Sequence, residues 1–169
     1  MSEKITVMIA DDIRETRDTI KTLLSFDARI EVVGEAEDGE DAVFLAREAR
    51  PDIILMDINM PKKDGIKATE EITIEVPETT IIIMSVQTDQ EYLRKAMTAG
   101  ARDYVTKPFA GEELIDTIVK TYELESKRRE KMVVPKIKEE IRAKIISVFS
   151  TKGGVGKTTI ATNLAVSIA

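Results

Sequence analysis

Short apolar runs alternate along this chain with longer stretches whose apolar residues recur at helical spacing. The runs cover residues 5–10, 30–36, 53–56, 80–84 and 103–106. An alternation of this kind predicts successive strand–helix units, whose strands lie parallel in one sheet with helices on both faces. Because the pattern continues from residue 1 to about residue 126, we expect this part of the chain to form one α/β domain.

Helices are expected in the intervals between the runs. The first should follow Asp12, and the second should be capped by Asp38 and end before Pro51, since proline disfavours helical geometry in the preceding residue. Residues 88–91 have the sequence of a capping box and should begin another helix, and a last helix should start near Gly111. The residues expected on buried helix faces are Ile13, Ile20, Leu23, Leu24, Val43, Ala46, Ala49, Leu114, Ile115, Ile118, Val119 and Tyr122.

Composition narrows the chemistry that this domain can perform. The 169 residues include no cysteine and no histidine, which excludes thiolate chemistry, a histidine base and imidazole metal ligands. Any bound metal must therefore be held by oxygen, which favours Mg²⁺ or a similar hard cation. A net charge of -6 argues against a nucleic-acid partner for the chain as a whole. No signal peptide or membrane span is expected, so we predict a cytoplasmic protein.

Five polar residues lie at or just past the carboxyl ends of four of the apolar runs. They are Asp11, Asp12, Asp57, Ser85 and Lys107. Open α/β sheets bind their ligands outside the carboxyl ends of the strands, so these side chains should meet at one edge of the sheet. Each alone has a structural explanation, such as a helix cap or a surface charge. Together, in this order, they indicate a functional site.

Carboxylates that converge on one point repel each other unless a cation compensates their charge. With Mg²⁺ in place all of them stay ionised, and one carboxylate is able to attack a phosphoryl group and form an aspartyl phosphate. The phosphoryl oxygens need a cation and a hydrogen-bond donor, which Lys107 and Ser85 would supply. A cis Lys107–Pro108 peptide bond is one way to turn the ammonium group back into the pocket.

Residues 1 to about 126 resemble the receiver domain of two-component response regulators. The resemblance rests on Asp11-Asp12, on residues 55–61 with Asp64-Gly65, on Ser85, and on residues 99–109, Ala-Gly-Ala-Arg-Asp-Tyr-Val-Thr-Lys-Pro-Phe. It implies a flavodoxin-like, doubly wound sheet of five parallel strands in the order 2-1-3-4-5. It also implies that Asp57 accepts a phosphoryl group from a histidine kinase or a phosphotransfer protein.

The same resemblance assigns roles to the other site residues. Asp12, Asp57 and the main-chain carbonyl of Asn59 would bind Mg²⁺ directly, and Asp11 would do so through water. Ser85 and Tyr104 would be the switch pair, with an output and homodimer face made by helix 4, strand 5 and helix 5. Val86 departs from the family's usual small residue and could narrow access to the site. Asn59 and Gln87 flank the site and are expected to influence the lifetime of the phosphoryl group.

The chain changes character after residue 126. Residues 127–143 are densely charged and contain Pro135, which predicts a charged helical linker with a break. Residues 144–169 then form an apolar run, a glycine-rich turn and the start of a helix. The turn reads Lys152, Gly153, Gly154, Val155, Gly156, Lys157, Thr158 and Thr159. This context fits a phosphate-binding loop, in which Lys157 reaches the outer phosphates and Thr158 binds Mg²⁺.

Lys152 makes this turn resemble the deviant Walker A motif of the ParA/MinD ATPase family, and its fusion to a receiver resembles regulators of the CpaE/TadZ type. One strand, the loop and part of a helix cannot bury both faces of a sheet, so we expect no ATPase activity from residues 144–169 and ATP binding only in a longer chain. A second interpretation is a localisation or dimerisation module of such an ATPase that acts without phosphorylation. A haloacid dehalogenase-like phosphatase is disfavoured, because it would require Asp-x-Asp where this chain has Asp11-Asp12.

Overall fold

The computed structural model describes residues 4–86 and 90–132. Its five strands are β1 (Ile5–Ala10), β2 (Ile30–Ala36), β3 (Ile53–Asp57), β4 (Thr80–Ser85) and β5 (Asp103–Thr106). They form one parallel sheet in the order β2-β1-β3-β4-β5, which confirms the predicted flavodoxin-like topology. The carboxyl ends of β1, β3, β4 and β5 consequently lie along one edge of the sheet.

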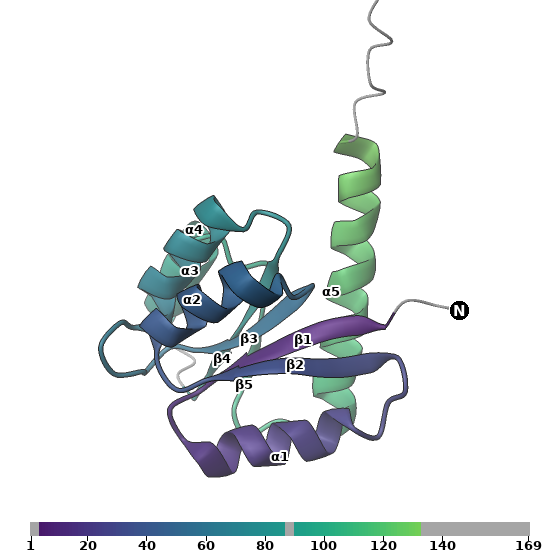
Figure 1. Ribbon diagram of the computed structural model, residues 1–169, viewed down its shortest axis with the longest axis horizontal. Coiled ribbons are helices and arrows are strands. Elements are labelled where there is room, and N and C mark those ends of the chain that lie inside the picture. Colours follow the sequence, from purple (N-terminus) through teal and green to yellow (C-terminus); the bar gives the residue numbers. More distant parts are fainter. Residues whose placement is uncertain (1–3, 87–89, 133–169) are drawn as a thin grey trace, which may run out of the picture. The chain divides into compact units, whose positions relative to one another are not determined.

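Five helices connect and flank these strands. They are α1 (Arg14–Leu24), α2 (Gly39–Ala49), α3 (Gly65–Glu75), α4 (Gln90–Thr98) and α5 (Gly111–Met132). Helices α2, α3 and α4 cover one face of the sheet, and α1 and α5 cover the other (Figure 1). The α/β architecture with helices on both faces is therefore as the apolar pattern predicted. The capping box predicted at residues 88–91 lies mostly outside the described residues.

The two faces of the sheet build two separate cores, because successive side chains of a strand point to opposite faces. On β1, Met8 and Ala10 pack with α2, α3 and α4, whereas Val7 and Ile9 pack with α1 and α5. The central strand β3 is buried along its whole length. Strands buried on both faces read as continuous apolar runs, which explains why the sequence showed runs without polar alternation.

Helix boundaries follow local signals in some places and not in others. Asp38 caps α2 as predicted, since its Oδ1 accepts hydrogen bonds from the main-chain N–H groups of Glu40 and Asp41, at 2.9 Å each. The predicted burial of Ile13 is wrong: this residue precedes α1 and is 53% exposed. The predicted burial is also wrong for Ala49, which is exposed at the last position of α2.

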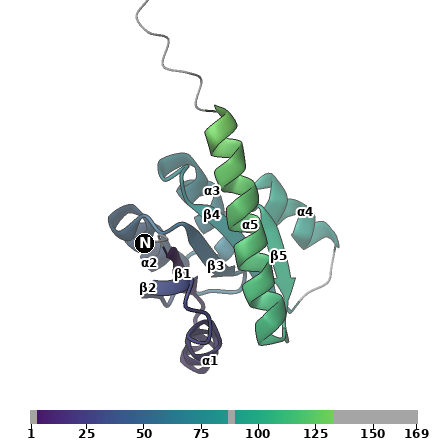
Figure 2. The same cartoon turned by 90° about the vertical axis from the view of Figure 1, so that its right-hand side faces the viewer.

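Helix α5 is the longest element and extends past the sheet (Figure 2). It continues beyond the predicted domain boundary at residue 126 as far as Met132, where the first of two compact units of the chain ends. Two interactions support this extension: Arg128 pairs with Glu125 one turn earlier, and Arg129 donates a hydrogen bond to Thr80 at the start of β4. No helix among the described residues has the length and apolarity needed to cross a membrane.

Candidate functional site

The polar residues predicted to converge do lie on neighbouring strands. Asp11 directly follows β1, Asp57 ends β3, Ser85 ends β4 and Lys107 directly follows β5. The main-chain N–H of Lys107 donates to the carbonyl oxygen of Ser85 at 2.8 Å, which continues the pairing of β4 with β5 up to the site. The parallel sheet thus brings residues almost a hundred positions apart to one edge.

Lys107 joins two of the carboxylates. Its Nζ lies 2.6 Å from Asp11 Oδ2 and 2.5 Å from Asp57 Oδ1. The side chains of Asp11 and Asp57 are 1% and 11% exposed, so both charges are held mostly away from water. The Lys107–Pro108 peptide bond is cis, as predicted. The Lys107 ammonium group therefore lies between the two buried carboxylates of the site.

Burial and charge shift the pKa values of this pair. Burial raises the pKa of Asp57, and the nearby Asp11 carboxylate adds to this effect, so that together they outweigh the lowering by Lys107. Burial alone would lower the pKa of Lys107, but its hydrogen bonds and charge interactions with Asp11 and Asp57 outweigh burial and raise it. Lys107 therefore stays charged at neutral pH. The raised pKa of Asp57 means that its ionised form is less favourable than it would be in water, and further positive charge nearby would favour that form.

The segment after Asp57 folds back onto it. The main-chain N–H of Asn59 donates to Asp57 Oδ2 at 2.7 Å, and the N–H of Gly65 donates to the carbonyl oxygen of Ile58 at 2.9 Å. A methyl group at Gly65 would overlap the carbonyl oxygen of Asp57, so only glycine fits there. One carboxylate oxygen of Asp57 thus faces Lys107, and the other faces the loop that carries Asn59.

The fold, the acidic site and the lysine together match one known family. A family model described as response regulator receiver domain matches residues 7–119 of this chain. The chain belongs to the response regulator receiver family. Because the match runs from within β1 into the first half of α5, it includes every site residue described above and all or most of every strand.

Relatives of this receiver occur in several bacterial proteins. It is 36% identical over 115 residues to the transcriptional regulatory protein DegU of Brevibacillus brevis, an alignment that covers 68% of this chain and 49% of DegU. It is 44% identical over 105 residues to protein-glutamate methylesterase/protein-glutamine glutaminase 3 of Syntrophomonas wolfei, covering 62% of this chain and 30% of that protein. The chain spans about half the length, or less, of these two curated relatives.

Solved structures support the same conclusion. The response regulator domain of Thermotoga maritima CheB has a TM-score of 0.67 with this receiver and 31% identity, and the match covers 72% of this chain and 98% of that domain. The signal receiver domain of the putative response regulator NarL from Mycobacterium tuberculosis has a TM-score of 0.69 and 27% identity, with the same coverage.

Not all predicted residues of the receiver site converge. Ser85 is 7% exposed and lies at the sheet edge, but Tyr104 and Val86 are 47% and 64% exposed. Asp12 is exposed as well, next to the buried Asp11. Within residues 4–86 and 90–132, no group of three or more acidic side chains lies close enough together to hold a metal ion. Gln87 and residues 152–159 lie outside the described residues.

Arg17 is a residue of this site that the sequence did not single out. It is 5% exposed, and its Nη1 donates a hydrogen bond to the main-chain carbonyl oxygen of Asp11 at 2.7 Å. Its guanidinium group also lies 3.1 Å from a carboxylate oxygen of Glu37 and 3.5 Å from one of Glu35. A charged residue in a helix is normally assigned to solvent. The signal that could have revealed its burial is its spacing from Ile20 and Leu24, three and seven residues later on the buried face of α1.

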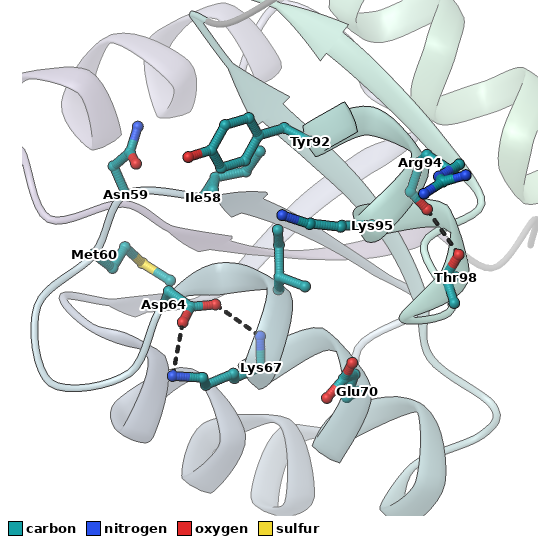
Figure 3. A pocket seen from close by; sticks show the side chains of 11 residues that line it. Ile58, Asn59, Met60, Asp64, Lys67, Glu70, Tyr92, Arg94, Lys95 and Thr98 are labelled. Carbon is teal, nitrogen blue, oxygen red and sulfur yellow. Dashed lines mark hydrogen bonds and ion pairs between the residues drawn. The ribbon is translucent and has the colours of Figure 1, made fainter. Parts of the chain in front are cut away.

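A groove of about 970 Å³ opens beside the site, between α3 and α4 (Figure 3). Asn59 and Tyr92 line one side of it, and Lys67 and Glu70 line the other. Cations and acids are mixed on its walls, where Lys67 also pairs with Asp64. The groove therefore has no predominant charge that would favour an anionic or a cationic ligand. It does expose the loop that follows Asp57 to solvent.

Proposed function

We propose that this receiver accepts a phosphoryl group on Asp57 and thereby acts as the phosphoacceptor of a two-component phosphorelay. The observation that carries this proposal is the position of Lys107 Nζ between Asp11 Oδ2 and Asp57 Oδ1 at the carboxyl edge of the sheet. A buried carboxylate that faces a fixed ammonium group has a cation ready for the negative charge that a phosphoryl group would bring.

The donor would be a phosphohistidine of a histidine kinase or a phosphotransfer protein, since receiver domains accept phosphoryl groups from histidine kinases. A carboxylate oxygen of Asp57 attacks phosphorus, the phosphorus–nitrogen bond of the phosphohistidine breaks, and the histidine leaves with its electron pair. The products are an aspartyl phosphate and a free histidine. Lys107 neutralises one phosphoryl oxygen during this transfer, and the Ser85 hydroxyl donates a hydrogen bond to another.

The residues present fit a Mg²⁺ ion in their chemistry, because Asp11, Asp12 and Asp57 offer carboxylate oxygens, which hard cations prefer. Asp12, Asp57 and the carbonyl of Asn59 would bind the ion, and Asp11 would hold it through water. When bound, Mg²⁺ supplies positive charge that lowers the repulsion among the carboxylates and the phosphoryl oxygens. Burial raises the pKa of Asp57, so additional positive charge at the site would favour its ionised form.

A direct test is labelling with a small phosphodonor such as acetyl phosphate. We expect one phosphoryl group per chain, detected by intact-protein mass, that requires Mg²⁺ and is absent in Asp57→Asn. Asp18→Asn, on the exposed side of α1, is the matched control and should be labelled like the wild type. Labelling that persists in Asp57→Asn would show that another residue is the acceptor. No labelling of the wild type would favour the alternative, a localisation or dimerisation module that acts without phosphorylation.

Residues beside Asp57 should set the lifetime of the aspartyl phosphate. We propose that Asn59 and Gln87 orient the hydrolytic water and that the branched side chain of Val86 restricts its access. Asn59→Ala and Gln87→Ala should then change the dephosphorylation rate, and Val86→Ala should increase it. The measurement is loss of label after the phosphodonor is removed. Rates equal to that of the wild type in all three variants would contradict this assignment.

The effect of phosphorylation would be transmitted to the partner-binding surface through Ser85 and Tyr104. We propose that the Ser85 hydroxyl moves toward the phosphoryl group and that the ring of Tyr104, now 47% exposed, turns inward behind it. The surface that would change is made by α4, β5 and α5, and we propose it as a homodimer face. Sedimentation with and without beryllofluoride, a phosphoryl mimic, tests this; equal masses would contradict it.

The output domain is proposed from the sequence alone. The turn at residues 152–159 supports a ParA/MinD-like ATPase fused to the receiver in a longer cytoplasmic protein, with ATP as its ligand. We propose that phosphorylation of Asp57 regulates that ATPase. The 169-residue chain should show no ATP turnover, and turnover that is lost in Lys157→Ala would contradict the expectation that this segment is inactive on its own.

A further inference from the structure

The loop between β3 and α3, residues 58–64, is held in place at several points. At its start, the main-chain N–H of Asn59 is bound to Asp57 Oδ2, and at its end Gly65 packs against the main chain of Asp57. In its middle, Lys62 pairs with Asp38 at the start of α2, and Lys63 pairs with Glu71 of α3.

Asp38 provides the contact from α2. This carboxylate is 5% exposed, and its two oxygens have separate tasks: Oδ1 caps α2, and Oδ2 lies 2.5 Å from Lys62 Nζ. The hydrogen bond from Lys62, followed by the N–H of Asp41, lowers the pKa of Asp38. Asp38 is therefore ionised at neutral pH, which is the form that pairs with Lys62.

The main chain at Lys62 needs such a contact. Lys62 has a φ of 60°, a left-handed conformation that costs a residue with a side chain about 1–2 kcal/mol. Next to it, the carbonyl oxygen of Lys63 lies so close to Gly39 that a methyl group at that position would overlap it. The N-terminus of α2 and the β3–α3 loop are thus in contact both through their main chains and through the Asp38–Lys62 ion pair.

We propose that the Asp38–Lys62 ion pair positions the β3–α3 loop so that the carbonyl of Asn59 is presented to a metal ion beside Asp57. Asp38 and Lys62 are positioning residues that do not touch the metal themselves. This inference rests on the proposed function, because it assumes that Mg²⁺ binds at Asp57. The pair links the start of α2 to the phosphoryl site, although these segments are far apart in the sequence.

The test measures Mg²⁺ affinity by isothermal titration calorimetry in Asp38→Asn, Lys62→Gln and the double variant. Asparagine still caps a helix, and Lys62 is on the surface, so all three should fold. We expect the dissociation constant for Mg²⁺ to rise about tenfold in each single variant, the size seen when residues that orient metal ligands are lost. The double variant should be no weaker than the single variants, because both remove the same contact.

Lys67→Gln is the matched control, since it removes the exposed Lys67–Asp64 pair at the other end of the same loop. It should leave Mg²⁺ affinity unchanged. At saturating Mg²⁺, phosphorylation by acetyl phosphate should return to the wild-type level in Asp38→Asn and Lys62→Gln, which a general loss of folding would not allow.

Wild-type Mg²⁺ affinity in both single variants would overturn the positioning role while leaving the proposed function intact. Effects of the two substitutions that add in the double variant would overturn it too, because the residues would then act separately. A wild-type chain that binds no Mg²⁺ would instead overturn the proposed function, and this inference with it.

Discussion

Lys107 Nζ lies 2.5 Å from Asp57 Oδ1, so the residue after β5 supplies the positive charge for the carboxylate that ends β3. The same ammonium group also binds Asp11, which follows β1. One cation therefore holds together two buried acids that would otherwise repel each other. This relationship makes the site sensitive to any change in charge.

Replacing Lys107 with methionine should destabilise the protein. With the ammonium group removed, Asp11 and Asp57 face each other without compensation, which we expect to cost about 3 kcal/mol in the free energy of unfolding at pH 7. Mg²⁺ should restore part of this loss, because it brings positive charge to the same carboxylates. Urea denaturation with and without Mg²⁺ measures both effects.

Lys4→Met is the control for this experiment. Lys4 forms a long, exposed pair with Glu31, at 3.8 Å, and its loss should change stability by less than about 0.5 kcal/mol. If Lys107→Met were equally mild, the ammonium group would have no essential part in holding the site together.

The stability contributed by Asp38 should depend on pH. Its pKa in the folded protein lies below its ordinary value of 3.8, mainly because of Lys62, so its contribution is complete above pH 3.8. As the pH falls through the lowered pKa, the carboxylate is protonated in the folded protein and the contribution is lost. The difference in unfolding free energy between wild type and Asp38→Asn should therefore be largest near neutral pH and shrink below 3.8.

Urea denaturation of both proteins between about pH 3 and pH 7 provides the measurement. Repeating it in a Lys62→Gln background should remove most of the pH dependence of this difference. A difference that grows as the pH falls would contradict the direction assigned to the pKa of Asp38.

Gly65→Ala should disturb the site through the main chain. The added methyl group would overlap the carbonyl oxygen of Asp57, so either β3 or the start of α3 must move, at a cost of about 3 kcal/mol. Labelling of Asp57 by acetyl phosphate should slow as well. Gly34→Ala in β2 is the control: its methyl group would lie 3.4 Å from Met8 Cγ, an ordinary contact, and should change neither property.

Arg17→Met should be costly although Arg17 is on a surface helix. Its removal leaves the buried carbonyl oxygen of Asp11 without this hydrogen-bond donor and removes one cation beside Glu35 and Glu37, which we expect to cost about 2 kcal/mol. Arg14→Met, three residues earlier, removes only an exposed pair with Asp18 and should cost less than about 0.5 kcal/mol. Thermal and urea denaturation distinguish the two; equal losses would mean that the burial of Arg17 has no energetic importance.

Much of this fold was predictable because its signals are local. Each strand was marked by an apolar run, and the cap at Asp38 was marked by an acid before a helical pattern. Errors occurred where local pattern and tertiary contact disagree. Ile13 fits the apolar face of a helix by spacing but lies before α1 begins. Arg17, for which nothing was predicted, is a charged residue on the same face as Ile20 and Leu24, where it is buried and pairs with Glu35 of β2.

The sequence by itself determined the order of strands and helices and placed Asp11, Asp57, Ser85 and Lys107 at strand ends, since the spacing of apolar residues is a property of neighbours in the chain. Only the tertiary structure decided which of these groups touch. Lys107 binds two acids, Arg17 pairs with Glu35 of β2, and Lys62 pairs with Asp38, and in each case the partner comes from a different strand–helix unit. Contacts between units depend on how the sheet and its covering helices pack, and the spacing of residues along the chain does not specify that packing.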